Sequence, residues 1–307
     1  MFALKEILIK SYRLATSPWR NLSLAKMSRA SKVPVQVLFY HRVADEIMNP
    51  WTISCDQFQQ QIDWMQENFD LISLAEAQRR IRFGNQRPAV AITFDDGYSD
   101  NSSFALPMLI ERKIPVTYFA TTYHTTHGKP FPHDVERGQP LATNSIESLR
   151  ALANAGVDIG GHTRMHCDLG AGLTDEQIYD EVIAATRELE SMIGTSIEYF
   201  AFPFGQKNNL DPRVFKVLKD NGFSGVCSAY GGVNEVGSEE FHLQRMHGDP
   251  NLERMKNWLS GDPRIRNVVR YQWQEELRLQ PQKPQSITNW SKRRSIQRNA
   301  VVSKETL

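Results

Sequence analysis

Residues 89–97, AVAITFDDG, join an apolar run to two adjacent carboxylates and a glycine. The apolar part predicts a buried strand, and the end of such a strand is where an α/β fold gathers its catalytic groups. Asp95 and Asp96 repel each other when buried, so a bound cation or a shared proton is expected beside them. An ordinary turn from strand to helix is the alternative that this motif alone leaves open.

Apolar, β-branched runs alternate with segments of helical period on both sides of this stretch, which favours βα units and a mainly parallel sheet. Roughly seven or eight strands with helices between most of them favour closure over an open sheet. The sequence therefore predicts an α/β fold made of a single distorted (β/α) barrel of about seven strands. The expected strands are 35–41, 71–74, 89–96, 116–121, 157–161, 198–202, 223–228 and 243–247.

Helix boundaries are predicted from capping residues and glycines. One helix is expected to begin after a cap at Asp56. Others are expected from Ser73 to Gly84, before Lys113, over 146–155, from Thr174 to Gly194 and from Asp211 to Gly222. The polar segment 123–143 has no clear period and predicts an inserted loop, either shaping a cleft or lying on the surface.

The chain divides into three predicted parts. Residues 1–32 form a basic segment, expected to be helical, that either packs on the domain or lies on an anionic membrane surface. Residues 33–260 form the catalytic domain. Residues 261–307, rich in Gln, Lys, Arg and Ser beyond residue 280, form a C-terminal extension expected to be largely disordered.

Composition narrows the possible partners and the compartment. A net charge of +1 gives no reason to expect nucleic acid as a partner. Three cysteines without close paired spacing favour a reduced compartment, and no apolar run reaches the roughly 20 residues of a membrane span. Because charged residues interrupt the apolar N-terminus, no export signal is expected either. The expected location is cytoplasmic, with peripheral membrane contact left open through the N-terminal segment.

A second motif, residues 160–166 (GGHTRMH), also follows a predicted strand. His162 and His166 are separated by three residues, so two imidazoles at one strand end can reach a single ion. Divalent metals such as zinc bind imidazole and carboxylate ligands. Two histidines at this spacing, taken alone, more often occur by chance than as metal ligands. The two motifs together favour a metal site.

With both motifs, residues 35–249 resemble polysaccharide deacetylases of the NodB-homology, carbohydrate esterase family 4 type. The resemblance implies a hydrolase that removes N-acetyl groups from amino sugars of a polysaccharide, oligosaccharide or glycan precursor. It implies that Asp95 is the catalytic base and that Asp96, His162 and His166 hold a divalent metal ion. Zinc is favoured for that ion, with cobalt, nickel and manganese as alternatives.

Two further stretches extend the resemblance. In residues 200–205 (FAFPFG), the residue after the proline, Phe204, is implied to offer its backbone N–H to the oxyanion. Residues 243–247 (LQRMH) resemble the late motif that ends in the general acid, which is implied to be His247.

The chain also resembles the exopolysaccharide-biosynthesis subgroup. Residues 40–43 (YHRV) are similar to its first strand, so His41 is expected to line the cleft. Family members commonly carry an arginine two residues before the proline to hold the catalytic carboxylate, and this chain has Ala201 there. Arg245 is expected to replace that arginine from a neighbouring strand. His124 and His242 are interpreted as surface or loop histidines.

Two other functions remain open from the sequence. One is hydrolysis of a non-sugar amide, which acetate release from N-acetylglucosamine oligomers distinguishes. The other is a non-catalytic carbohydrate-binding relative. The joint presence of the five residues assigned to chemistry argues against it.

Overall fold

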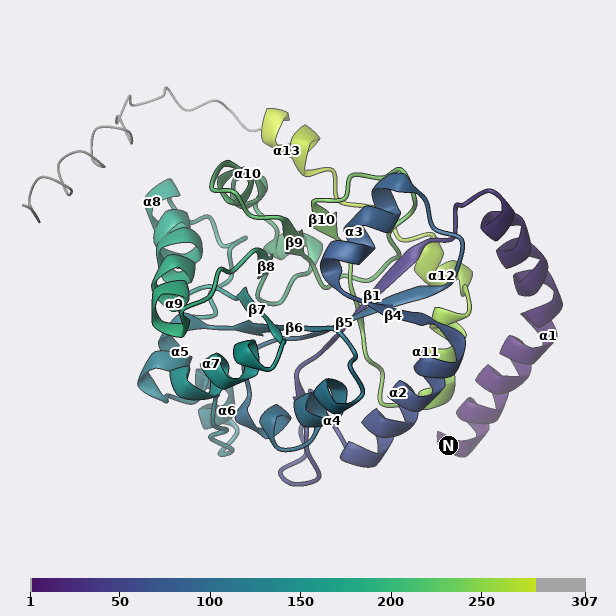
Figure 1. Ribbon diagram of the computed structural model, residues 1–307, viewed down its shortest axis with the longest axis horizontal. Helices are drawn as coiled ribbons and strands as arrows, with labels where there is room; N and C mark the ends of the chain where they lie inside the picture. Colours follow the sequence, from purple (N-terminus) through teal and green to yellow (C-terminus); the bar gives the residue numbers. More distant parts are fainter. Residues whose placement is uncertain (1, 280–307) are drawn as a thin grey trace, which may run out of the picture. The chain divides into compact units, whose positions relative to one another are not determined.

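β5 (Ala89–Phe94) lies inside a parallel β-sheet, as Figure 1 shows. The structure is a computed structural model that describes residues 2–279. β1 (Val35–Tyr40) pairs in register with β5 along its whole length. Every residue of both strands is buried. Such mostly apolar runs are typical of parallel strands that are covered on both faces.

Within the described residues, eight strands form one hydrogen-bonded path, β10-β9-β8-β7-β6-β5-β1-β11, and β4 pairs with the first half of β5. Only Gln244 and Arg245 separate β10 from β11, the two ends of that path. The sheet therefore curves until residues 242–247, which contain β10 and β11, pair with β9 on one side and β1 on the other. The predicted distorted barrel is confirmed. The other strands are β2 (Arg42–Val43), β3 (Thr52–Ile53), β4 (Asp70–Ile72), β6 (Val116–Ala120), β7 (Asp158–Gly161), β8 (Tyr199–Ala201), β9 (Gly225–Cys227), β10 (His242–Leu243) and β11 (Met246–His247).

Helices are arranged around the sheet in the unit that ends at Tyr271 (Figure 1). A second unit begins at Gln272 and includes α13 (Trp273–Leu279). The other helices are α1 (Phe2–Arg29), α2 (Cys55–Asn68), α3 (Leu74–Phe83), α4 (Ala105–Glu111), α5 (Thr122–His127), α6 (Pro132–Glu136), α7 (Ile146–Asn154), α8 (Asp175–Ile178), α9 (Ala185–Ile193), α10 (Pro212–Asp220), α11 (Leu252–Leu259) and α12 (Pro263–Arg266).

Side chains on one face of β5 and of the stretch after β10 extend from the apolar core to the polar strand ends. Ala89 and Ala91 of β5 belong to one buried apolar cluster that also includes Leu243. Because side chains repeat every second residue along a strand, Asp95 continues the row of Ala89 and Ala91, and Arg245 continues that of Leu243. The polar residues at the strand ends are therefore placed above the apolar core.

Several predicted boundaries were wrong. α2 is capped by Ser54, whose side chain accepts from the Gln57 N–H in a capping box, rather than by Asp56. The segment 123–143 is not a plain loop, since it contains most of α5 and all of α6. The last predicted strand is interrupted at residues 244–245. α12 and α13 lie beyond residue 260, and residues 280–307 lie outside the described residues.

The N-terminal segment forms α1, which lies against α11. Arg13 pairs with Glu253 at 2.9 Å, and Arg20 donates to the carbonyl of Asn257 at 2.9 Å. No helix among residues 2–279 is both long enough and apolar enough to cross a bilayer.

Asp158, at the start of β7, predicts a measurable pH dependence of stability. Burial, with a smaller contribution from Glu198, raises its pKa to about 6, although the Thr117 hydroxyl donates to it at 2.9 Å. A raised folded-state pKa favours the protonated form, so its stabilising contribution is full below about pH 4 and is lost as pH rises through 6.

Asp158→Asn, which is neutral at every pH, is therefore expected to raise the free energy of unfolding at pH 7 by about 1 to 3 kcal/mol. At pH 4 it should change little. Urea denaturation at both pH values measures this, and equal stabilisation at the two would contradict the assignment.

Candidate active site

The backbone is strained where the two motifs and the turn after β8 meet. Asp96, Thr163, His166 and Phe204 have φ values of 70°, 63°, 56° and 59°. This left-handed conformation costs a non-glycine residue about 1 to 2 kcal/mol, and such strain gathers at functional sites. It points the side chains on these turns in directions that an ordinary strand end does not allow.

The two glycines of the second motif lie where side chains pack closely against the sheet. Neither Gly160 nor Gly161 has a positive φ, and both lie within β7. A Cβ on Gly160 would lie 2.2 Å from the Phe119 ring, and one on Gly161 would lie 2.6 Å from the Thr186 hydroxyl. The glycines therefore allow neighbouring side chains to pack directly against the strand.

Asp96, His162 and His166 converge at the carboxyl ends of β5 and β7. Their ligand atoms all lie within 4.8 Å of one another. One oxygen of Asp96, Oδ1, is 3.3 Å from Nε2 of His162 and 3.1 Å from Nε2 of His166. The structure thus brings together the three residues that the resemblance named as metal ligands.

The donor atoms of this cluster fit a cation. Nδ1 of His162 lies 2.8 Å from the carbonyl oxygen of Ala201. Since a carbonyl only accepts, Nδ1 carries a proton, and Nε2 is the ring nitrogen that faces Asp96. Oδ1 of Asp96 is buried and accepts no hydrogen bond. A divalent ion between these atoms satisfies both the carboxylate and the imidazole lone pairs.

The charge of Asp96 supports the same conclusion. Burial by itself raises its pKa, but His166 and His162 outweigh burial and lower it well below the usual value. The buried group is therefore an ionised carboxylate, the form that binds metal.

Asp95 is held by a buried arginine. Nη1 and Nη2 of Arg245 donate to the two carboxylate oxygens at 2.6 and 2.8 Å. Arg245 is 0% exposed and also donates to Thr93 and to the Ser228 carbonyl. Its guanidinium lies 4.9 Å from the centre of the Phe39 ring. Arg245 is therefore rigid, and it orients Asp95 in a chain that has Ala201 where the family has its arginine.

Two histidines stand beside Asp95 at the ends of β1 and β11. The rings of His41 and His247 are 5.9 Å apart. Burial lowers the pKa of His41, against the raising effect of Asp96 and Asp95. Burial and the neighbouring His41 lower the pKa of His247 to about 4, while Asp95 opposes the shift. His247 is therefore neutral at pH 7 in the resting protein.

Two aromatic groups flank His166 on the other side of the carboxylates. Phe204 is 55% exposed, and its ring lies 5.0 Å from that of His166. The ring of His133, from α6, lies 6.0 Å from His166, and Nε2 of His133 is 3.2 Å from the Tyr98 hydroxyl. Segment 123–143 thus contributes a side chain beside the site.

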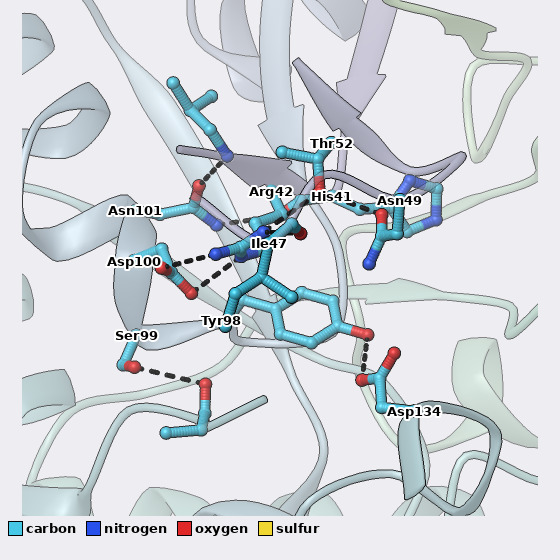
Figure 2. Close-up of polar contacts among 12 residues, drawn as sticks. His41, Arg42, Ile47, Asn49, Thr52, Tyr98, Ser99, Asp100, Asn101 and Asp134 are labelled. Atoms are coloured by element: carbon cyan, nitrogen blue, oxygen red, sulfur yellow. Dashed lines mark hydrogen bonds and ion pairs between the residues drawn. The ribbon is translucent and has the colours of Figure 1, made fainter. Parts of the chain in front are cut away.

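The loop after β1 is fixed by a network that Figure 2 shows. Arg42 donates from Nε and Nη2 to both oxygens of Asp100 at 2.8 Å, and from Nη1 to the Ile47 carbonyl at 2.8 Å. Asn101 donates to the His41 carbonyl at 2.7 Å and accepts from the Val43 N–H. The turns after β1 and β5 are therefore tied together beside the site.

The loop that this network fixes carries three exposed apolar side chains. Ile47, Met48 and Trp51 are 50%, 51% and 42% exposed, and Ile47 has a φ of 49°. The Trp51 ring lies 5.1 Å from that of His41. A flat aromatic surface therefore stands beside the cleft.

The sequence did not indicate the roles of Arg42, Asp100 or Trp51. The one available signal was a charged residue, Arg42, directly after a buried strand, but its partner is 58 positions away. The interpretation of His124 and His242 as surface residues was wrong. They are 2% and 0% exposed, and His242 contacts the Ser228 hydroxyl at 2.8 Å.

Comparison with known proteins agrees with this geometry. The family model described as polysaccharide deacetylase matches residues 82–226, a range that includes both motifs and Phe204. A Bacillus subtilis protein named as a polysaccharide deacetylase, YxkH, is 24% identical over 241 residues, which cover 77% of each chain.

Two solved structures share the fold. The deacetylase PplD of Streptococcus pyogenes, in complex with acetate, has a TM-score of 0.61 at 19% identity and covers 75% of this chain and 99% of its own. IcaB from Ammonifex degensii has a TM-score of 0.60 at 23% identity, with 74% and 97% covered. At these identities the likeness concerns the fold alone.

Proposed function

We propose that this chain, whose residues 82–226 match the family model described as polysaccharide deacetylase, is a hydrolase of carbon–nitrogen bonds that removes N-acetyl groups from the amino sugars of a polysaccharide or glycan precursor. We further propose that this activity depends on a divalent metal ion, preferably zinc, held by Asp96, His162 and His166. The carrying observation is the buried, unpaired Asp96 oxygen between two imidazole nitrogens, next to a second carboxylate fixed by Arg245.

The roles proposed for the side chains follow from their positions. Asp96, His162 and His166 would hold the metal ion, which would supply Lewis-acid chemistry by polarising the amide carbonyl and making a water molecule more acidic. Asp95, which is not a ligand, takes the proton of the attacking water. The backbone N–H of Phe204 stabilises the oxyanion, an effect typically of about 3 kcal/mol on the barrier. Arg245 positions Asp95 through its two hydrogen bonds, and His41 lies beside His247 and Trp51.

His247 is proposed to protonate the departing amine. Because its pKa is about 4, it must first receive a proton during turnover. The proton that Asp95 removes from water is available on the same side of the site. One proton of the water thus reaches the departing nitrogen through Asp95 and His247, which breaks the carbon–nitrogen bond. The acetic acid that forms gives its remaining proton to the amine, so the products are acetate and an amino sugar with an ammonium group.

Acetate release tests this function. The full chain, loaded with zinc, is incubated with N-acetylglucosamine pentamer, and acetate and free amine are measured. Equal amounts of both are expected. No release from oligomers, together with hydrolysis of a small non-sugar amide, would assign the alternative activity.

Trp51 is expected to stack on a sugar ring next to the one that reacts. It is exposed and adjacent to His41, and its backbone N–H donates to the side-chain oxygen of Asn49 at 2.9 Å. Trp51→Ala should therefore raise KM for the pentamer about tenfold, equivalent to about 1.4 kcal/mol, with kcat changed less than about twofold. Trp51→Phe, which keeps a flat ring, should lie near wild type, and an unchanged KM in the alanine variant contradicts this role.

We propose peripheral membrane contact through the outer face of α1. Leu8, Tyr12, Trp19 and Leu22, spaced by four, seven and three residues, are 61%, 45%, 59% and 73% exposed. That spacing places them on one side of the helix. The helix has six basic residues and one acidic residue, which favours an anionic surface.

Leu8→Glu is expected to abolish co-sedimentation with vesicles of phosphatidylcholine and phosphatidylglycerol. The matched control is Phe83→Glu, since Phe83 is 72% exposed on α3. Binding that survives Leu8→Glu, or that Phe83→Glu reduces equally, contradicts the proposed contact.

A further inference from the structure

A cavity of about 360 Å³ lies between α1 and the amino ends of β1, β4 and β5. Residues preceding or beginning those strands form its floor, among them Val33, Gln36, Phe69 and Pro88. The candidate active site lies at the carboxyl ends of the same sheet, so the two sites are at opposite ends of the barrel. The volume is within the usual range of small-molecule sites, about 300 to 1,000 Å³.

The charged residues that line this cavity are all basic. Arg13, Arg20 and Arg266 contribute to its wall, and no aspartate or glutamate of the described chain does. Arg13 is paired with Glu253 and Arg266 with Glu235, at 2.9 and 3.4 Å. These partners compensate two of the three arginines.

Arg20 is different because it is buried without an acidic partner. It is 6% exposed and donates to the carbonyl and the side-chain oxygen of Asn257 at 2.9 and 2.8 Å. Among residues 2–279, no carboxylate lies within ion-pair distance of it. Asn257 lies in the last turn of α11, whose carbonyl end has only a partial negative charge. Its guanidinium carbon also lies 5.4 Å from the centre of the Tyr12 ring. Neither contact supplies a full negative charge, so an anion beside this guanidinium would compensate its burial.

The free hydrogen-bonding atoms of the cavity wall point to the same chemistry. Nε of Arg13 and Nε of Arg20 are buried and have no partner. Oε1 of Gln36, a residue that is 6% exposed, is also buried and unpartnered, although its Nε2 donates to the Leu259 carbonyl at 3.0 Å. Trp64 adds an aromatic wall. The cavity thus offers two cationic donors, one acceptor and an apolar surface.

We propose that this cavity binds a phosphate-bearing molecule, with the phosphate contacting Arg20 and Arg13 and a hydroxyl group donating to Gln36. Charge-assisted bonds from guanidinium groups suit phosphate oxygens. A lipid headgroup and a soluble phosphate ester share this chemistry. The site does not depend on the proposed deacetylation.

Calorimetric titration of the full chain with inorganic phosphate and glycerol 3-phosphate tests the site. Arg20→Met should weaken the affinity for both about tenfold or more. Lys10→Met removes the same charge from an exposed position of α1 that does not line the cavity, and it should change the affinity less than about twofold. Because Arg20 also contacts Asn257, Arg13→Gln serves as a second variant, since it removes the other proposed phosphate contact from a side chain that is 21% exposed. It should also weaken the affinity for both phosphate probes.

Vesicle sedimentation distinguishes the two sources. Binding to phosphatidylglycerol vesicles that falls in Arg20→Met but not in Lys10→Met assigns a lipid headgroup. If Arg20→Met binds vesicles as well as the wild-type protein does but has lost its affinity for phosphate, the ligand is a soluble phosphate ester. Wild-type protein that binds neither phosphate probe, or affinities unchanged in both Arg20→Met and Arg13→Gln, overturns the proposal.

Discussion

Replacing Asp95 with asparagine is expected to reduce deacetylation by about a thousandfold while one metal ion per chain stays bound. General base catalysis typically contributes about 10² to 10⁴ in rate, and an amide cannot accept the proton of water. The metal should remain because Asp95 takes its bonds from Arg245 and lies outside the cluster of Asp96, His162 and His166. The assay is acetate release by enzyme whose metal content is measured in parallel.

The control for Asp95→Asn is Asp70→Asn. Asp70 also pairs with an arginine, Arg80 at 2.8 Å, but it begins β4 at the other end of the barrel. It should keep wild-type turnover. Wild-type rates in Asp95→Asn would show that another group is the base, and simultaneous loss of metal would make Asp95 part of the ligand set.

Replacing His162 with alanine is expected to remove both the metal and the activity. His162 is 2% exposed and its tautomer is fixed by the Ala201 carbonyl, so no water molecule readily takes its place. Loss of a residue that only hydrogen-bonds to a metal ligand typically costs about ten- to a hundredfold in metal affinity, so loss of a ligand should cost more than about a hundredfold.

Elemental analysis after dialysis, together with acetate release, measures both effects of His162→Ala. His127→Ala is the matched control, because His127 is an exposed histidine of α5 and does not belong to the metal cluster. Stoichiometric zinc in His162→Ala would remove this residue from the ligand set. Asp95→Asn and His162→Ala are thus expected to differ. Loss of the base lowers the rate alone, whereas loss of a ligand lowers both the rate and the metal content.

The fold could be predicted because its signals are local. The buried run before Asp95 and the caps at Ser73 and Thr174 act within a few residues, so periodicity and capping rules located their elements. The interruption at residues 244–245, which closes the barrel, leaves no local pattern of that kind.

The site could be predicted only in part. Motif resemblance named the residues that converge, but the contact of Arg245 with Asp95 spans 150 positions and that of Arg42 with Asp100 spans 58. Left-handed backbone at Asp96 and Phe204 is also invisible in the sequence, because non-glycine residues are rarely found there. Tertiary structure decides these features.

Anomalous diffraction at the zinc edge, from crystals of the full chain grown with zinc, tests the central claim most directly. The account predicts a peak about 2.0 to 2.2 Å from Oδ1 of Asp96 and from Nε2 of His162 and His166, with Asp95 beyond bonding distance. A zinc-saturated crystal with no peak between these three side chains, or with zinc bound elsewhere only, would contradict it.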